Sequence, residues 1–275
     1  MLGPYFFRNN ALFPVAEAVV ALDDLAYANG YGVYETLRVR SGTVFFPAEH
    51  ESRLFHSARI IGLEHSFGEG AVVDAMAELV RANRLKDASL RVMLVGGRAS
   101  RLFVTALDPI VTDPRLYQEG ARAITVAGER FLPQAKSLNM LLSTMAYRRA
   151  QAEGAYDALL MNNRKEITEG TRTNFYVVRG EAVVTAPAGQ VLEGVTRSIV
   201  LEVARNSGIA VRQEPVLLSS LADADGCFLT STSPGVLPLR QVDGYSFQVP
   251  TVVHKLMSAY DHYLKEYATG QGGVT

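Results

Sequence analysis

The chain has 275 residues, with 27 basic and 28 acidic side chains and a formal net charge of −1. Hydrophobic residues make up 48% of it, so it can bury a sizeable core in one large domain or two smaller ones. The balanced charge leaves no basic excess to neutralise phosphates, so we expect no nucleic-acid partner. The single cysteine, Cys227, excludes an internal disulfide and fits a reducing compartment. The N-terminus lacks a signal-peptide pattern and no apolar run approaches the roughly 20 residues that span a bilayer, so we expect a cytoplasmic protein without a membrane partner.

The N-terminal part of the chain predicts two strands, then two helices, and then two further strands, LRVMLVGG and RLFVTALD. Residues 15–22 and 32–40 have the apolar content of strands, and a turn at Ser41-Gly42 follows the second. From Ala48 to Gly62, and again over 70–84, apolar residues recur at helical spacing. Side chains alternate between the two faces of a strand, so one face of the second strand should carry Tyr34, Thr36 and Arg38.

A polar break with proline and glycine, TDPRLYQEG at 112–120, is the predicted domain boundary. Strands and helices mix on both sides of it without a regular βαβ repeat. We therefore expect a two-lobed α/β or α+β fold with mixed sheets and flanking helices, not a doubly wound sheet. The expected parts are an N-terminal α/β domain over 1–113, a linker over 114–122 and a C-terminal domain over 123–275.

The C-terminal part predicts three helices separated by strands. The stretch SLNMLLSTMAYRRAQAEG, residues 137–154, has helical composition and ends in glycine. A second helix is expected from about Thr196 to Asn206, and a third over 252–268. The strands between them include CFLTST, which ends in hydroxyl side chains.

Among the five lysines, Lys136 has the least polar surroundings. It follows a predicted strand and precedes a strongly apolar helix, whereas the other four have the composition of solvated surface positions. Burial among apolar side chains favours the neutral amine, which is the nucleophilic form that Schiff-base lysines need. The alternative is a lysine whose stem is covered while its ammonium reaches water.

Three further stretches could bind an anion. Gly194 leads into the helix near Thr196, and a helix N-terminus offers free N–H groups, although Thr196 could equally be an ordinary N-cap. Arg53 lies one turn from His50 at a helix start and could bind a phosphate with two N–H groups or be a surface arginine. The hydroxyls at the end of CFLTST could donate to the same anion or simply cap a polar loop; they belong to Thr230, Ser231, Thr232 and Ser233.

In ITEGTRTNF, residues 167–175, Glu169 and Arg172 adjoin a run that is typical of a buried strand. A carboxylate is costly to desolvate there unless a cation meets it. Arg172 could be that cation, or it could bind a substrate carboxylate with two N–H groups. The five histidines show no metal-ligand spacing, so we expect no metal site.

Taken in chain order, these motifs resemble the class IV aminotransferases, which are pyridoxal-phosphate enzymes of fold type IV. The resemblance runs from about residue 20 to 245. Its most specific parts are EHxxRL at 49–54, KxLN at 136–139, TEGxxxN at 168–174 and GxTR at 194–197. The resemblance implies a pyridoxal 5'-phosphate cofactor between the lobes, a homodimer, and small-molecule amino acid and 2-oxo acid substrates.

The resemblance also implies a role for each matching residue. Lys136 resembles the lysine that forms a Schiff base with the cofactor and then shuttles a proton between the substrate Cα and cofactor C4′. Glu169 matches the carboxylate that pairs with the pyridine nitrogen and keeps the ring electron-accepting. The implied phosphate contacts are Arg53, the N–H groups of Val195 and Thr196, and the hydroxyls of Ser231 and Thr232.

Substrate recognition is the least specific part of the resemblance. The D-amino-acid members hold the α-carboxylate with an arginine and a histidine in an SPRxH loop, and the corresponding loop here, VGGRASRLF, is shorter and has no histidine. Arg98 or Arg101 could substitute. The substrate-contact candidates are Tyr34, Thr36, Arg38, Arg98, Arg172 and Thr173.

The expected activity is a ping-pong aminotransferase reaction. KxLN is closer to the D-amino-acid enzymes and the aminodeoxychorismate lyases than to the branched-chain enzymes, which carry GGNY. D-alanine or D-glutamate is therefore favoured as donor over branched-chain L-amino acids, with pyruvate or 2-oxoglutarate as acceptor. One alternative is a 4-amino-4-deoxychorismate lyase that releases pyruvate. The other is a non-catalytic binding protein in which Glu169 simply pairs with Arg172.

Overall fold

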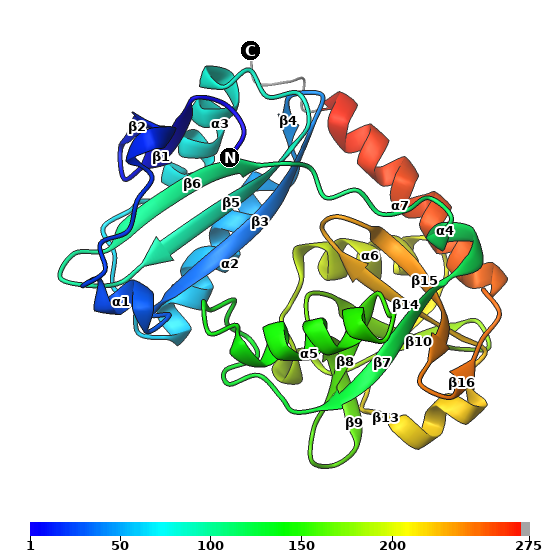
Figure 1. The fold of residues 1–275 in the computed structure, drawn as a ribbon. Helices are drawn as coiled ribbons and strands as arrows, with labels where there is room; N and C mark the ends of the chain where they lie inside the picture. Colours follow the sequence, from blue (N-terminus) through cyan, green and yellow to red (C-terminus); the bar gives the residue numbers. More distant parts are fainter. Residues whose placement is uncertain (271–275) are drawn as a thin grey trace. The chain divides into compact units, whose positions relative to one another are not determined.

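The computed structural model describes residues 1–270, which form two compact units (Figure 1). Of the described residues, the first unit contains 1–110, the short segment 135–139 and 266–270. The second contains residues 111–134 and 140–265. The expected linker, 114–122, therefore lies inside the second unit, where it forms a short helix and enters a strand.

The first unit is built on a six-stranded antiparallel sheet with strand order β2-β1-β6-β5-β3-β4. Helices α2 (Pro47–Ile60) and α3 (Ala71–Ala82) cover one face of this sheet and bury its apolar side chains (Figure 1). The short helix α1 spans Leu25–Ala28. The strands are β1 (Tyr5–Arg8), β2 (Ala11–Pro14), β3 (Gly32–Arg40), β4 (Thr43–Val44), β5 (Ala88–Val95) and β6 (Arg101–Leu107).

The strand predicted over 15–22 is wrong. Strand β2 ends at Pro14, a 3₁₀ turn follows over Val15–Glu17, and the next residues have no regular structure. Val19 and Leu22 are 79% and 103% exposed, so the apolar pattern of this stretch does not reflect burial in the sheet. Strand periodicity alone cannot distinguish a core strand from an exposed apolar loop.

The segment 135–139 is added to the first unit by backbone pairing with β3. The N–H of Tyr34 donates to the carbonyl of Lys136 at 2.9 Å, and the N–H of Leu138 donates to the carbonyl of Gly32 at 2.8 Å. An isolated antiparallel bridge joins Val33 to Ser137. Because these residues are extended, the helix predicted from residue 137 begins only at Leu141.

The second unit is built on a ten-stranded mixed sheet with the order β12-β11-β10-β14-β15-β7-β8-β9-β13, to which β16 adds beside β15. Helix α5 (Leu141–Ala152) packs on β7 and β8, and helix α6 (Val195–Asn206) packs on β12 and β14 (Figure 1). The strands are β7 (Ala121–Ala127), β8 (Asp157–Met161), β9 (Glu166–Gly170), β10 (Asn174–Arg179), β11 (Ala182–Thr185), β12 (Ala210–Gln213), β13 (Val216–Leu217), β14 (Gly226–Ser231), β15 (Gly235–Val242) and β16 (Tyr245–Ser246).

The remaining helices are α4 (Leu116–Glu119) and α7 (Thr251–Gly270), with 3₁₀ turns at Ala188–Gln190 and Leu218–Asp223. Cys227 is fully buried in β14, as expected for a packing cysteine. No helix within residues 1–270 combines the length and the apolar character that crossing a membrane requires.

Strands β9 and β10 form a tight hairpin in which Glu169 pairs with Asn174 across the ladder. Only residues 171–173 separate the two strands. Away from this one pair, β9 lies between β8 and β13, and β10 lies between β11 and β14. The turn that joins them therefore lies inside the sheet, and every residue of β9 is buried. In the TEGxxxN motif, the side chains that flank the turn are therefore buried and have little freedom, whereas Arg172 within the turn is exposed.

Candidate active site

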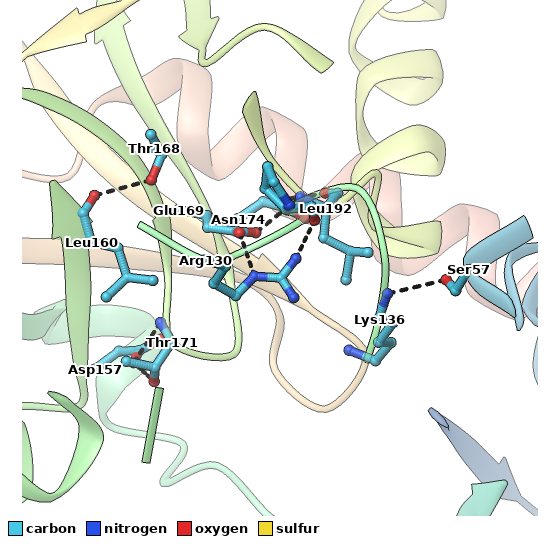
Figure 2. Close-up of polar contacts among 11 residues, drawn as sticks. Ser57, Arg130, Lys136, Asp157, Leu160, Thr168, Glu169, Thr171, Asn174 and Leu192 are labelled. Carbon is cyan, nitrogen blue, oxygen red and sulfur yellow. Dashed lines mark hydrogen bonds and ion pairs between the residues drawn. The ribbon is translucent and has the colours of Figure 1, made fainter. Parts of the chain in front are cut away.

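In the first unit, Lys136 lies beside the aromatic ring of Tyr34. Its Nζ is 4.7 Å from the ring centroid, and its backbone N–H donates to the buried hydroxyl of Ser57 at 3.1 Å (Figure 2). Lys136 is half-buried, and Tyr34 is buried on β3. Backbone pairing on one side and Ser57 on the other thus fix the position from which the amine projects.

Arg53, from α2, is fixed by a buried carboxylate that the sequence did not single out. Its Nε donates to Glu35 Oε1 at 2.7 Å and its Nη2 to Oε2 at 2.5 Å, while Nδ1 of His50 lies 2.7 Å from the same Oε2. Burial by itself would raise the pKa of Glu35, but the Arg53 guanidinium and His50 outweigh it and lower that pKa to about 2. Burial also lowers the pKa of His50, against the attraction of Glu35.

Arg91, on β5, is a second residue that the sequence did not single out. Its guanidinium carbon lies 4.5 Å from the Tyr34 ring centroid, so the ring contacts both this guanidinium and the Lys136 amine. Among residues 1–270, no carboxylate forms an ion pair with Arg91. Arg91 lies opposite Thr36 on the neighbouring strand, and this pairing could have identified it as a site residue. Which residues of β3 and β5 face each other cannot, however, be predicted from one strand alone.

In the second unit, Glu169 is buried and its cation is Arg130. Arg130 Nε donates to Glu169 Oε1 at 2.8 Å, and its Nη2 donates to the carbonyl of Pro133 (Figure 2). The N–H of Leu192 donates to the other oxygen, Oε2, at 3.1 Å. We expected a cation beside this buried carboxylate, and that cation is Arg130, which lies 39 positions from Glu169 in the sequence. The alternative in which Glu169 pairs with Arg172 is wrong.

Leu192 links this carboxylate to the start of α6. The carbonyl of Leu192 accepts from the side-chain amide of Asn174 at 2.9 Å, and Gly194 is the N-cap residue of α6. A Cβ on Gly194 would lie 2.4 Å from Asn174 Oδ1, so only glycine fits. Within the described chain, no side chain caps this helix, which leaves its first-turn N–H groups, including those of Val195 and Thr196, available to an anion.

Ser231 ends β14 and Thr232 follows it, and both are half-buried. Beneath them, Thr230 is buried and its hydroxyl lies 3.1 Å from the Tyr176 hydroxyl. The Tyr176 ring stacks on Phe228 with the centroids 4.5 Å apart. The hydroxyl pair predicted for an anion therefore extends from a rigid, aromatic-packed strand end.

The predicted substrate residues are divided between the units: four lie in the first, and Arg172 and Thr173 lie in the second. Arg98 is exposed, and Arg101 is paired with Asp24. Arg172 is exposed and stacks on two tyrosine rings, whereas Thr173 donates its hydroxyl to Asp157 at 2.8 Å. The candidates on β3 lie as expected for a strand with one buried face, with half-buried side chains at Thr36 and Arg38.

The model of the family "Amino-transferase class IV" matches residues 32–242. The chain is 34% identical to a D-alanine aminotransferase of Bacillus licheniformis, over 86% of this chain and 87% of that protein. It is 32% identical to a Methanocaldococcus jannaschii protein named "Putative branched-chain-amino-acid aminotransferase", over 86% and 88%. The structure of a branched-chain aminotransferase from Thermoproteus uzoniensis, solved with norvaline, superposes with a TM-score of 0.87 at 27% identity, covering 94% of this chain and 93% of that one.

The chain belongs to the class IV aminotransferase family, and its fold is the fold type IV that the motifs predicted. Members of this family use pyridoxal phosphate, and one structural neighbour of the chain is solved with pyridoxamine 5'-phosphate. The chain is a pyridoxal-phosphate-dependent transaminase.

The residues present fit this cofactor. A pyridine N–H needs a carboxylate acceptor, and Glu169 is buried and ionisable. A phosphate needs convergent N–H donors, and the uncapped start of α6 offers them. An aldehyde needs an amine, and Lys136 is a half-buried lysine held at its backbone on both sides.

Proposed function

We propose that the enzyme transfers the amino group of a D-amino acid such as D-alanine or D-glutamate to a 2-oxo acid such as pyruvate or 2-oxoglutarate, by a ping-pong mechanism. The observation that carries the cofactor chemistry is a single network in the second unit. It joins the buried carboxylate of Glu169, through Leu192 and Asn174, to the uncapped N-terminus of α6. A carboxylate and an anion site held in one rigid frame are complementary to a pyridinium ring that bears a phosphate.

Pyridoxal phosphate, when bound, supplies an aldehyde that takes up amino groups and a ring that accepts electrons. Glu169 would accept a hydrogen bond from the pyridine nitrogen and hold the proton there. Lys136 would hold the cofactor covalently, yield that position to the substrate amine, and carry a proton from the substrate Cα to C4′ with its Nζ. The backbone contacts of Lys136 support this role because a proton carrier must stay within reach of both carbons.

The residues that match the family's motifs are the proposed phosphate contacts. In the second unit we assign them to the N–H groups of Val195 and Thr196 and to the hydroxyls of Ser231 and Thr232. In the first unit we assign Arg53. Glu35 supports this assignment by holding the guanidinium plane with two hydrogen bonds, so little side-chain entropy is lost on binding.

For the substrate carboxylate we assign Arg91, ahead of the sequence candidates Arg38, Arg98 and Arg172. Its guanidinium contacts the same Tyr34 ring as the Lys136 amine, which keeps it near the reacting nitrogen. Arg98 is exposed, and Arg172 is held by tyrosine rings. A carboxylate would replace water at Arg91 with two charge-assisted hydrogen bonds.

The donor is tested by a half-reaction screen on the purified holoenzyme. Single amino acids are added without acceptor, and conversion of the bound cofactor is followed by its visible absorbance. We expect D-alanine and D-glutamate to convert it and L-leucine to react slowly or not at all. Rapid conversion by L-leucine with none by D-alanine would overturn the donor assignment in favour of a branched-chain enzyme.

The lyase alternative is tested in the same preparation with 4-amino-4-deoxychorismate. A lyase releases pyruvate from it without consuming a 2-oxo acid, whereas we expect no pyruvate from the aminotransferase. Borohydride reduction followed by peptide mass spectrometry tests the lysine. We expect the cofactor to be fixed on the peptide that contains Lys136.

We also propose that the enzyme is a homodimer. In the single chain, a run of apolar side chains after the first hairpin is exposed, with Val19, Leu22 and Leu25 at 79%, 103% and 70%. Apolar runs with this exposure commonly mark protein interfaces. Sedimentation should give a dimer, and Leu22→Glu with Leu25→Glu should shift it toward monomer. A wild-type monomer at micromolar concentration would contradict the proposal.

A further inference from the structure

A second buried carboxylate, Asp157, holds the turn between β9 and β10. Asp157 is fully buried at the start of β8. Its Oδ1 accepts hydrogen bonds from the hydroxyl and the N–H of Thr171 (Figure 2). Its Oδ2 accepts one from the hydroxyl of Thr173 at 2.8 Å. Both hydroxyl side chains of the three-residue turn are therefore tied to one carboxylate group.

The turn is packed against this carboxylate without spare room. A Cβ on Gly170 would lie 2.6 Å from Asp157 Oδ2 and 2.1 Å from the Thr173 hydroxyl oxygen. The backbone N–H of Thr171 also donates to the carbonyl of Ala158 at 3.0 Å. Any displacement of Asp157 is therefore transmitted directly to the backbone of the turn.

Arg172 holds the same turn from its exposed side. Its guanidinium carbon lies 4.3 Å from the ring centroid of Tyr147 and 4.9 Å from that of Tyr156, and its Nη2 donates to the carbonyl of Tyr156 at 3.2 Å. Tyr156 immediately precedes Asp157 in the chain. The turn is thus fastened to one stretch of chain, residues 156–158, by a carboxylate inside and a guanidinium outside.

The residues on either side of the turn carry the proposed cofactor contacts. Glu169 precedes Gly170, and Asn174 follows Thr173, and the two pair across the ladder. Both also contact Leu192, which leads to the start of α6. A shift of the turn would therefore change the direction of the Glu169 carboxylate and the position of the phosphate-binding helix start together.

We propose that Asp157 is a positioning residue that aims Glu169 at the cofactor's pyridine nitrogen by fixing the turn over 171–173. This inference rests on the proposed pairing of Glu169 with that nitrogen. In this role Arg172 holds the exposed side of the same turn. Its guanidinium contacts the rings of Tyr147 and Tyr156 and does not bind the substrate.

Substitutions at Asp157 separate the positioning role from simple stability. In Asp157→Asn, the remaining Oδ1 can accept from Thr171 while the amide donates to the Thr173 hydroxyl, so the turn should keep its place. In Asp157→Ala, both hydroxyls lose their acceptor, and the turn is free to move. Thr173→Val removes a single contact at nearly constant volume and folds more securely than the alanine variant.

The test is the protonation of the pyridine nitrogen, followed by ¹⁵N NMR on holoenzyme loaded with ¹⁵N-labelled pyridoxal phosphate. Glu169→Gln is the reference, because it removes the carboxylate itself. We expect Asp157→Ala to lower the midpoint of nitrogen protonation by about one pH unit, a tenfold loss, in the direction of Glu169→Gln. Thr173→Val should shift it less in the same direction, and Asp157→Asn should stay near wild type.

The matched control is Asp243→Ala. Asp243 accepts from the N–H of Thr125 at 2.8 Å and from its hydroxyl at 2.6 Å, which is the same chemistry at a different loop of the second unit. It should leave the nitrogen unchanged even if it lowers stability.

Three results would overturn the inference. One is a shift in Glu169→Gln with none in Asp157→Ala or Thr173→Val. Another is an equal shift in the Asp243→Ala control, which would reveal a general loss of structure. An unchanged nitrogen in Glu169→Gln is distinguishable from both, since it would overturn the proposed role of Glu169 and the inference with it.

Discussion

Each compact unit buries a carboxylate that makes hydrogen bonds to two side chains, but the two carboxylates differ in their partners. Glu35 in the first unit is met by a guanidinium and an imidazole, and its pKa falls to about 2. Asp157 in the second unit is met by two hydroxyls, and burial raises its pKa above the ordinary 3.8 despite their hydrogen bonds. A similar degree of burial therefore leaves a carboxylate ionised where a guanidinium and an imidazole meet it, and favours the protonated form where its side-chain partners are hydroxyls.

The largest expected effect is that of Glu35→Gln. Removing the charge breaks the ion pair with the Arg53 guanidinium, whose side chain is only 11% exposed. Breaking a buried pair in this way costs about 3–5 kcal/mol of unfolding free energy, measured by urea denaturation. Glu49 is an exposed acid on α2, the helix that carries Arg53, and Glu49→Gln should cost less than about 0.5 kcal/mol. Equal losses of unfolding free energy in the two variants would show that the charge of Glu35 contributes no more to stability than the charge of an exposed acid.

The next effect is the loss of unfolding free energy at low pH. Because the pKa of Glu35 is lowered on folding, its contribution is present above the ordinary 4.5 and is lost as pH falls toward about 2. The lowered pKa of His50 acts in the same direction, and its loss begins as pH falls below 6.5. The unfolding free energy of the wild type should therefore fall steadily on acidification. A flat profile between pH 6.5 and about pH 4 would contradict the His50 shift, and a flat profile from there toward about pH 2 would contradict the Glu35 shift.

The raised pKa of Asp157 should change stability with pH in the direction opposite to that of Glu35 and His50. A raised pKa means that ionised Asp157 opposes folding at neutral pH, and this cost disappears as pH falls through its folded pKa toward 3.8. Asp157→Asn should therefore be at least as stable as wild type near neutral pH, within about 1 kcal/mol, and its advantage should vanish in acid. Urea midpoints of the two proteins across that range test the sign. An advantage that grows on acidification would refute it.

The smallest expected effect is that of Arg172→Ala. Its exposed guanidinium stacks on two rings, and each exposed cation–π contact contributes about 0.5–1 kcal/mol. We expect a loss of about 1 kcal/mol and little change in the KM for the amino donor. Arg172→Lys should recover less than half of the loss, because a compact ammonium cannot stack on both rings. A large rise in KM with unchanged stability would restore Arg172 as a substrate residue.

Most of the secondary structure and the family motifs could be predicted from the sequence, because they depend on local periodicity and spacing. The strand at 32–40, the helix after Gly194 and the burial of Glu169 are local properties of this kind. The ion pair of Glu169 with Arg130 could not be predicted, because its partners are brought together by strand register and a loop, not by sequence distance.

The same limit applies to Glu35 and Asp157. Glu35 stands on the apolar face of a strand, where alternation alone predicts a hydrophobic residue, and only the packing of α2 supplies Arg53 and His50. Asp157 opens a strand and reads as an ordinary turn residue until the β9–β10 hairpin lies against it. Polar residues that break a local pattern need tertiary partners to be understood.

The position of residues 135–139 limits how the chain can be cut into separate domains. These residues belong to the first unit, but both of their flanking segments belong to the second. A fragment that stopped at Ile110 would lack the hydrogen bonds that Tyr34 and Gly32 make with this segment, and it would lack Lys136 itself. No single cut separates the units with each one complete. Recombining domains between relatives would therefore require exchanging this segment together with the N-terminal part, so that Lys136 stays with the strand that holds it.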